Sequence, residues 1–205
     1  MNKHKDKSIL GILLTALVLC ALVVLVAMPT PASAAENVWT EMTSRTETWF
    51  HKVWGSAADD VFVLSSPQDS KDYILHYNGS NWTDMAIPLI TSTDIQAKGI
   101  WGSAADDVFV VGSILTEEAG RQGIILHYNG TSWSKMDIPP GTLPGRWNQL
   151  KRVWGSAADD VFAFGYSTEV TNVEYALLHY DGSKWTRIPL PDEFNNQDLC
   201  ELING

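Results

Sequence analysis

The chain is almost free of cysteine, since only Cys20 and Cys200 occur among its 205 residues. Cys20 lies in an apolar segment near the N-terminus, so the rest of the chain contains a single thiol. No disulfide can form within that part, and its stability has to come from packing or from assembly. Cys200 would either pair with a second chain or act as a small buried apolar residue, and we favour the second interpretation.

Positive charge is also scarce. The chain has 14 Lys and Arg residues against 24 Asp and Glu, which gives a net charge of −10. An acidic protein is repelled by phosphate backbones and by anionic membrane surfaces. We therefore expect no nucleic-acid partner. The same acidity helps to keep an exported protein soluble.

Motifs for common catalytic chemistry are missing. The sequence has no P-loop, no dinucleotide-binding glycine motif, no H-E-x-x-H and no G-x-S-x-G. A sialidase-like enzyme would need an arginine cluster for the substrate carboxylate, yet the arginines after residue 35 are scattered. We expect no cofactor, no metal site and no catalytic residue. The scattered arginines are Arg45, Arg121, Arg146, Arg152 and Arg187.

There is one long hydrophobic run, from Ile9 to Met28. Lysines precede it, and the small residues 32–35 follow it, which is the pattern of a secretory signal peptide. The run is also long enough to span a bilayer. Residues 1–35 are therefore a signal peptide or an uncleaved N-terminal membrane anchor, with membrane contact only through residues 9–28 if uncleaved. Both alternatives place residues 36–205 outside: secreted, or anchored to the outer side of the cytoplasmic membrane.

The most informative feature that is present is a repeat. The nine-residue segment Trp-Gly-Ser-Ala-Ala-Asp-Asp-Val-Phe starts at Trp54, Trp101 and Trp154, positions that differ by 47 and 53 residues. Each copy is followed by a Leu-His-Tyr-Asn/Asp-Gly segment and then by a further tryptophan. Repeats of roughly 40–50 residues are typical of propellers and related arrays.

Each repeat predicts four short antiparallel strands. In the second copy these are residues 98–103, 108–111, 123–128 and 131–136, with a variable loop between the second and third. Asn129-Gly130 is a strong hairpin signal between the last two strands. We predict an all-β chain: a β-propeller-type array of three four-stranded antiparallel blades plus an extra N-terminal strand, which forms an incomplete ring. The blades would cover about residues 52–91, 99–140 and 152–191 of a repeat domain at 36–205.

The combined pattern W-G-S-x-x-D-V-F followed by I-L-H-Y-[ND]-G-x-x-W resembles the repeats of a family of exported bacterial β-propeller proteins. The resemblance covers residues 53–191. It implies a propeller fold. It implies only a loose function, because propellers carry many unrelated ones.

The two ends of the repeat region are not whole repeats. Residues 37–42 match a fourth strand, and residues 196–203 loosely match the approach to a first strand. Closed propellers usually have about four to eight blades, so three blades leave open edges. Three alternatives stand: a homo-oligomer in which two chains complete a ring, an open arc with capped ends, or a fragment of a longer propeller protein.

The repeated polar and aromatic residues favour structural roles. His76, His127 and His179 share one strand position, whereas catalysis needs a unique constellation. We expect them to be internal hydrogen-bonding residues. We expect the paired aspartates of each repeat to cap their own turn rather than to bind calcium. The repeated tryptophans would pack between blades.

Sequence variation is confined to one end of the predicted blades. There the loops between second and third strands, and the linkers between repeats, differ in length, and such loops often carry binding function. We predict a non-enzymatic binding or interaction module for a protein, a cell-wall polymer or a glycan. The alternative is a glycan-active hydrolase or lyase. The candidate ligand-binding residues are Asp69, Lys71, Asp72, Glu117, Glu118, Arg121, Arg146, Trp147, Glu169 and Glu174.

Overall fold

The computed structural model describes residues 49–66, 73–87, 95–143, 147–169 and 172–190, all within the compact unit Ser44–Gly205. The predicted signal or anchor segment and the partial repeats at 37–42 and 196–203 lie outside the described residues. Within the described ranges, no helix is long and apolar enough to cross a membrane.

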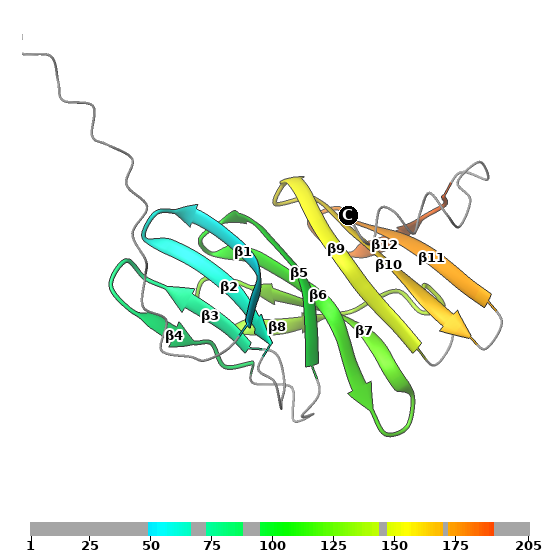
Figure 1. Ribbon diagram of the computed structural model, residues 1–205. Helices are drawn as coiled ribbons and strands as arrows, with labels where there is room; N and C mark the ends of the chain where they lie inside the picture. The colour runs from blue at the N-terminus through cyan, green and yellow to red at the C-terminus, as the bar shows by residue number, and fades with distance from the viewer. Residues whose placement is uncertain (1–48, 67–72, 88–94, 144–146, 170–171, 191–205) are drawn as a thin grey trace, which may run out of the picture. The chain divides into compact units, whose positions relative to one another are not determined.

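In the described residues, twelve strands form three units of four, each unit corresponding to one sequence repeat (Figure 1). Unit 1 consists of β1 (Trp49–Ala57), β2 (Asp60–Ser66), β3 (Tyr73–Tyr77) and β4 (Trp82–Asp84). Unit 2 consists of β5 (Ile95–Ala104), β6 (Asp107–Thr116), β7 (Gly120–Tyr128) and β8 (Trp133–Met136). Unit 3 consists of β9 (Trp147–Ala157), β10 (Asp160–Glu169), β11 (Asn172–Tyr180) and β12 (Trp185–Ile188).

The all-β prediction is confirmed, and consecutive strands within each unit pair antiparallel. Unit 1 is a separate four-stranded sheet. Units 2 and 3 are joined into one eight-stranded sheet by a parallel pairing of β7 with β9 at Arg121 and Trp147. The sheets of the described residues do not close into a ring.

The prediction of a long loop between the second and third strands of unit 2 is wrong. β6 continues to Thr116 and β7 starts at Gly120, so most of the expected loop is a hairpin closed by a tight turn. Ile114 pairs with Gln122 and Leu115 with Arg121. The same extension occurs in unit 3, where Glu169 pairs with Asn172. The β-branched and apolar residues after Gly112 favour pairing over a loop.

The hairpin between third and fourth strands exists in all three units, but its loop has four residues rather than two. Tyr77 pairs with Trp82, and the Asn78 side-chain oxygen accepts hydrogen bonds from the backbone N–H groups of Ser80 and Asn81 at 3.1 and 2.9 Å. An Asx turn of this kind replaces the missing backbone bonds. Gly79 has a φ of 85°, a conformation that favours glycine.

Two hydrophobic cores lie between neighbouring units. The first joins units 1 and 2 around Phe62 and Trp133, whose rings meet edge-on with centroids 6.4 Å apart. The second joins units 2 and 3 around Phe109 and Trp185, with centroids 6.1 Å apart. The indole N–H of Trp133 points at the sulfur of Met85 in unit 1, at 3.4 Å. The predicted packing of repeated tryptophans between units is therefore confirmed for these copies.

Candidate functional site

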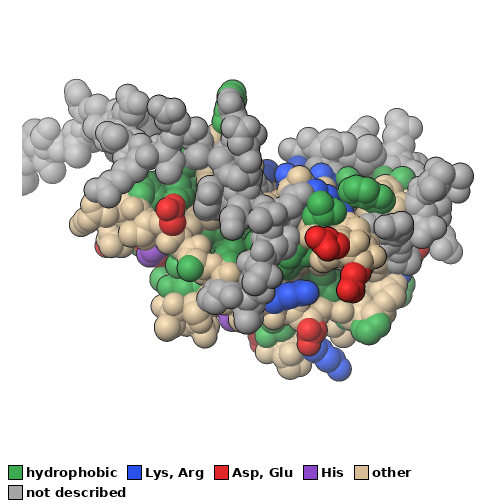
Figure 2. Space-filling model, turned by 90° about the horizontal axis from the view of Figure 1, so that it is seen from below, with side chains coloured by type: hydrophobic (Ala, Val, Ile, Leu, Met, Phe, Trp, Pro, Cys, Tyr) green, Lys and Arg blue, Asp and Glu red, His purple; other side chains and the backbone are tan. Residues whose placement is uncertain are grey.

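Those sequence-predicted residues that the structure describes lie at the end of the units where β6 turns into β7 and β10 into β11. Figure 2 views the chain from below Figure 1, and on this side basic and acidic side chains are interspersed with apolar ones. Asp69, Lys71, Asp72 and Arg146 lie outside the described residues. Glu117 and Glu118 are exposed in the β6–β7 turn, and Glu169 ends β10.

Glu174 is already engaged. Its carboxylate accepts a 2.7 Å bond from the Arg187 guanidinium on the neighbouring strand β12. Both side chains are about two-fifths exposed, at 41% and 37%, so the pair is a surface ion pair rather than part of a cleft. Glu174 therefore has an ion-pair partner within its own unit.

The structure brings two of the predicted residues together, Arg121 on β7 and Trp147 at the start of β9. They are opposite each other in the parallel pairing that joins units 2 and 3. The Arg121 guanidinium donates to the Ser113 hydroxyl at 3.3 Å. Trp147 is 55% exposed, which leaves an aromatic surface at the strand position opposite Arg121.

Beyond these two residues, a ladder of polar side chains follows the first strands of units 2 and 3. β5 and β9 are neighbours, and the Gln149 amide donates to Gln96 across them at 3.4 Å. The same amide donates to the buried hydroxyl of Ser113 at 3.0 Å. Gln149 of β9 thus contacts both Gln96 of β5 and Ser113, the residue that accepts the hydrogen bond from Arg121.

The first strand of every unit has a β-bulge at the same place. The register with the second strand shifts at His51 in β1, at Lys98 in β5 and at Lys151 in β9. A bulge redirects a side chain and is common beside functional sites. A basic or titratable residue therefore occupies the redirected position in all three repeats.

Lys98 and Lys151 are held near each other. A Cβ added at Gly99 would lie 3.3 Å from the Lys151 carbonyl oxygen, so this glycine allows β9 to approach β5 closely. Burial lowers the pKa of Lys151, and the charges of Lys98 and Arg152 lower it further. Among the described residues, no carboxylate forms an ion pair with Lys98 or Lys151. The ammonium of Lys151 lies 5.6 Å from the centre of the Tyr166 ring.

We call this group the β5–β9 seam. It combines positive charge, side-chain amides and one exposed indole along the junction of two units. The sequence contained a signal for it, since Gln and Lys recur five and three residues before the tryptophan of the second and third repeats. The seam consists of Gln96, Lys98, Arg121, Trp147, Gln149 and Lys151.

Apart from the seam, a hollow lies between units 2 and 3, at their fourth strands. It has a volume of about 590 Å³ and is lined by β8, the residues that follow it, and the turn before β12. Its apolar lining, Met136, Ile138 and Trp185, belongs to the core between these units. Lys135 and Lys184 supply its basic groups. We refer to it as the outer cleft.

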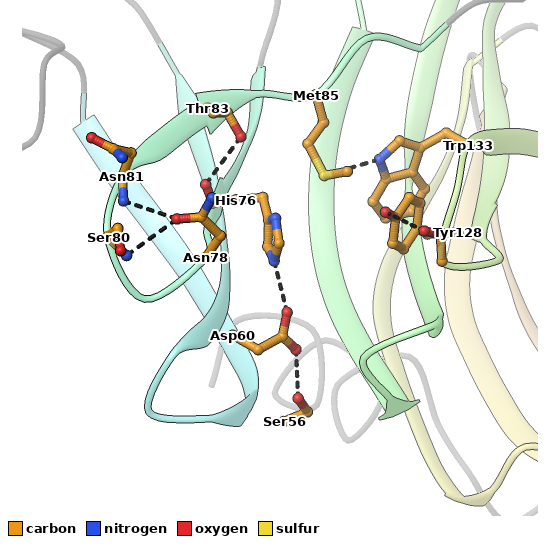
Figure 3. Close-up of polar contacts among 11 residues, drawn as sticks. Ser56, Asp60, His76, Asn78, Ser80, Asn81, Thr83, Met85, Tyr128 and Trp133 are labelled. Atoms are coloured by element: carbon orange, nitrogen blue, oxygen red, sulfur yellow. Dashed lines mark hydrogen bonds and ion pairs between the residues drawn. The ribbon is translucent and has the colours of Figure 1, made fainter.

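At the end that lies opposite to the β6–β7 turn, each unit has a Ser–Asp–His arrangement, which Figure 3 shows for unit 1. In unit 1, the Ser56 hydroxyl donates to Asp60 Oδ2 at 2.5 Å and His76 Nε2 donates to Asp60 Oδ1 at 2.7 Å. The His76 ring also lies on Phe62, with centroids 4.4 Å apart. The equivalent bonds join Ser103, Asp107 and His127, and also Ser156, Asp160 and His179.

This arrangement differs from a Ser–His–Asp triad. Serine and histidine both bond to the carboxylate, on its two different oxygens, so the hydroxyl does not contact the imidazole that acts as general base in a triad. The prediction of internal hydrogen-bonding histidines is confirmed. The prediction that the aspartates cap their own turn needs correction, because the second aspartate of each pair connects the first and third strands through Ser and His. The cause is the bulge at serine, which brings its hydroxyl to the carboxylate.

Across the described ranges of the chain, no group of three or more His, Cys, Asp or Glu side chains is placed to hold a metal ion.

No family model matches the chain, and no curated protein matches it. Among solved structures, a fucose lectin from Kordia zhangzhouensis, in complex with methyl-fucoside, aligns with a TM-score of 0.44 and 13% identity. The alignment covers 68% of this chain and 98% of the lectin chain. A similarity of this size assigns neither a ligand nor a family.

Proposed function

We propose that the chain is an exported, non-enzymatic binding module built as an arc of β-propeller blades, and that its ligand is an acidic glycan bound at the β5–β9 seam. The observation that carries this proposal is the placement of Lys98 and Lys151 at equivalent bulges of neighbouring strands, without a carboxylate partner among the described residues. Two like charges held together favour binding of an anion, which would relieve their repulsion.

The remaining seam residues support a sugar rather than a simple anion. Gln96 and Gln149 offer amide groups that can exchange hydrogen bonds with hydroxyls, and Arg121 offers a planar donor for a carboxylate. The exposed indole of Trp147 gives a flat apolar surface on which a sugar ring can stack. A uronic-acid residue in a short oligosaccharide presents all three matching groups.

The net charge of the chain limits the size of the ligand. At −10, the protein repels extended polyanions, but salt screens charges beyond about 10 Å at 0.1 M ionic strength. A short acidic oligosaccharide inside that distance experiences mainly the local lysines. This supports a carbohydrate over a nucleic acid.

Calorimetric titration with oligosaccharides of uronic acids and with matched neutral oligosaccharides tests the proposal. We expect binding of the acidic series only. Lys98→Gln and Lys151→Gln should each weaken it by roughly tenfold, the equivalent of a charged hydrogen bond of about 1.5 kcal/mol. Lys135→Gln removes the same charge from the outer cleft and should leave binding unchanged.

Equal binding of neutral sugars, or loss of binding in Lys135→Gln alone, would contradict the seam as the site. The same samples should be assayed for shortened products. Turnover of the oligosaccharide would contradict the non-enzymatic assignment and favour a glycan hydrolase or lyase.

A further inference from the structure

The two cores between units consist largely of equivalent residues, one repeat apart. Each unit contributes one set of side chains to the core with the following unit and a different set to the core with the preceding unit. Phe62 of unit 1 and Phe109 of unit 2 are equivalent members of the first set, and both are fully buried. Trp133 of unit 2 and Trp185 of unit 3 are equivalent members of the second set, at 2% and 3% exposure.

A tryptophan–glycine contact belongs to the same joint. A Cβ added at Gly102 in unit 2 would lie 2.6 Å from the Trp54 ring of unit 1, and one added at Gly155 in unit 3 would lie 2.6 Å from the Trp101 ring of unit 2. Each repeat therefore places its tryptophan on the glycine of the next repeat. Both covered glycines are buried.

Unit 3 has the first half of this joint without a covering unit among the described residues. Trp154 is 61% exposed, whereas Trp54 and Trp101 are half-buried. Phe162, the equivalent of Phe62 and Phe109, is only partly buried, and so is Leu177. We call this surface of unit 3 the tryptophan edge.

Unit 1 has the second half. Gly55 is exposed, and Val53, the equivalent of Ile100 and Val153 in the two cores, is 69% exposed. Phe50 is 46% exposed, although its equivalent Leu150 is completely buried. We call this surface of unit 1 the glycine edge.

From this complementarity we infer that the partner of these edges is a second copy of the chain. The tryptophan edge of one copy packs on the glycine edge of the other and makes the same joint a third time, with Trp154 on Gly55. The residues of these two edges are equivalent to those that already pack together at the two joints within one chain. A second copy can therefore bind through the same kind of contact. The contact is heterologous, and two chains that make it twice form a closed ring of six units. Six falls within the usual range of about four to eight blades.

The full chain should be expressed, recovered as the cell exports it, and measured by analytical ultracentrifugation. We expect one species with the mass of two chains over a wide range of concentration. A monomer would overturn the inference, including a monomer in which residues 37–42 of the same chain cover the glycine edge. A mass that keeps growing with concentration would overturn the closed ring.

Two variants test the direction of the contact. Val53→Glu charges the glycine edge and Trp154→Glu charges the tryptophan edge, and both replaced side chains are mostly exposed in the chain. We expect each variant alone to be a monomer that still melts cooperatively. Mixed together, they should pair one to one, since each retains the edge that the other has lost. The control Trp147→Ala removes a comparably exposed indole from the other end of β9 and should remain dimeric.

A dimer of Val53→Glu, or a mixture without pairing, would contradict head-to-tail contact. This inference stands apart from the ligand proposal, because the monomeric variants retain the β5–β9 seam within one chain. Oligosaccharide titration of those monomers therefore tests binding independently of assembly.

Discussion

Trp54 covers Gly102: a methyl group built on this glycine would lie 2.6 Å from Cη2 of the indole. The indole comes from unit 1 and the glycine from unit 2, so the absence of a side chain in one repeat makes room for the ring of the preceding one. The same relationship holds between Trp101 and Gly155. Within each Trp-Gly pair, the tryptophan therefore belongs to the joint with the following repeat and the glycine to the joint with the preceding one.

Gly102→Ala should destabilise the chain by about 1–3 kcal/mol, because the added methyl displaces a packed ring. Gly55→Ala is the matched control. Both glycines approach a backbone carbonyl equally, at 2.8 Å from the built Cβ, but among the described residues no indole contacts Gly55. Urea unfolding of both variants in a Trp154→Ala background, which removes the contact between copies, measures the difference. Equal losses would show that the indole does not contribute.

Asp107→Ala should cost about 1–3 kcal/mol of unfolding free energy, because it removes the acceptor of both Ser103 and His127. Asp106→Ala should change stability by less than about 0.5 kcal/mol, because Asp106 is exposed and its Cβ, which lies under Gly130, is retained. Thermal and urea unfolding test this pair. Loss of oligosaccharide binding in a folded Asp107→Ala protein would contradict a purely structural role.

Asp181 should contribute to acid sensitivity. Hydrogen bonds from the Ser183 side chain and from the backbone of Lys184 and Ser183 lower its pKa from 3.8 to about 2. A carboxylate with a lowered folded-state pKa stabilises the fold above its unfolded pKa, and this contribution is lost as the pH falls from about 4 to 2. Asp181→Asn, which copies Asn78 and Asn129, should therefore lose less stability over that range.

Melting temperatures of wild type and Asp181→Asn at a series of pH values test this prediction. Asp84→Asn removes an exposed carboxylate from β4 and controls for net charge. Parallel acid profiles for wild type and Asp181→Asn would contradict the assignment.

Lys98→Gln should raise the pKa of Lys151, because the charge of Lys98 is one of the causes that lower it. A titration of lysine side-chain carbon signals by NMR follows this directly. Lys135→Gln, on β8, should leave the Lys151 signal unchanged. A Lys151 titration unaffected by Lys98→Gln would mean that the two ammonium groups do not share a site. Acidic oligosaccharide added to the wild type should also raise this pKa.

Much of the local structure follows from the repeats alone. The Trp-Gly-Ser-Ala-Ala-Asp-Asp-Val-Phe segment predicts a strand, a turn and a strand, and the structure has them in all three copies. The Asn-Gly and Asp-Gly segments predict hairpins, although the Asx turn adds two residues to each loop. Hydrophobic alternation and turn chemistry act over a few residues, so the sequence displays them directly.

Which copies of the repeated residues make the contacts between units was not visible in that way. Identical repeats contain Trp54, Trp101 and Trp154, yet only Trp154 is mostly exposed, because burial depends on whether another unit lies next to it. The seam was missed for the same reason. Lys98 and Lys151 are far apart in sequence, and only the pairing of the units with their shared bulges brings them together.

The strands, the turns and the order of three repeats follow from the amino-acid sequence, since they depend on neighbouring residues. Packing between the units sets which copy of each repeated side chain is covered, which lysines meet and which edges stay open. Those properties depend on through-space packing between units, in which chemically identical residues have different neighbours.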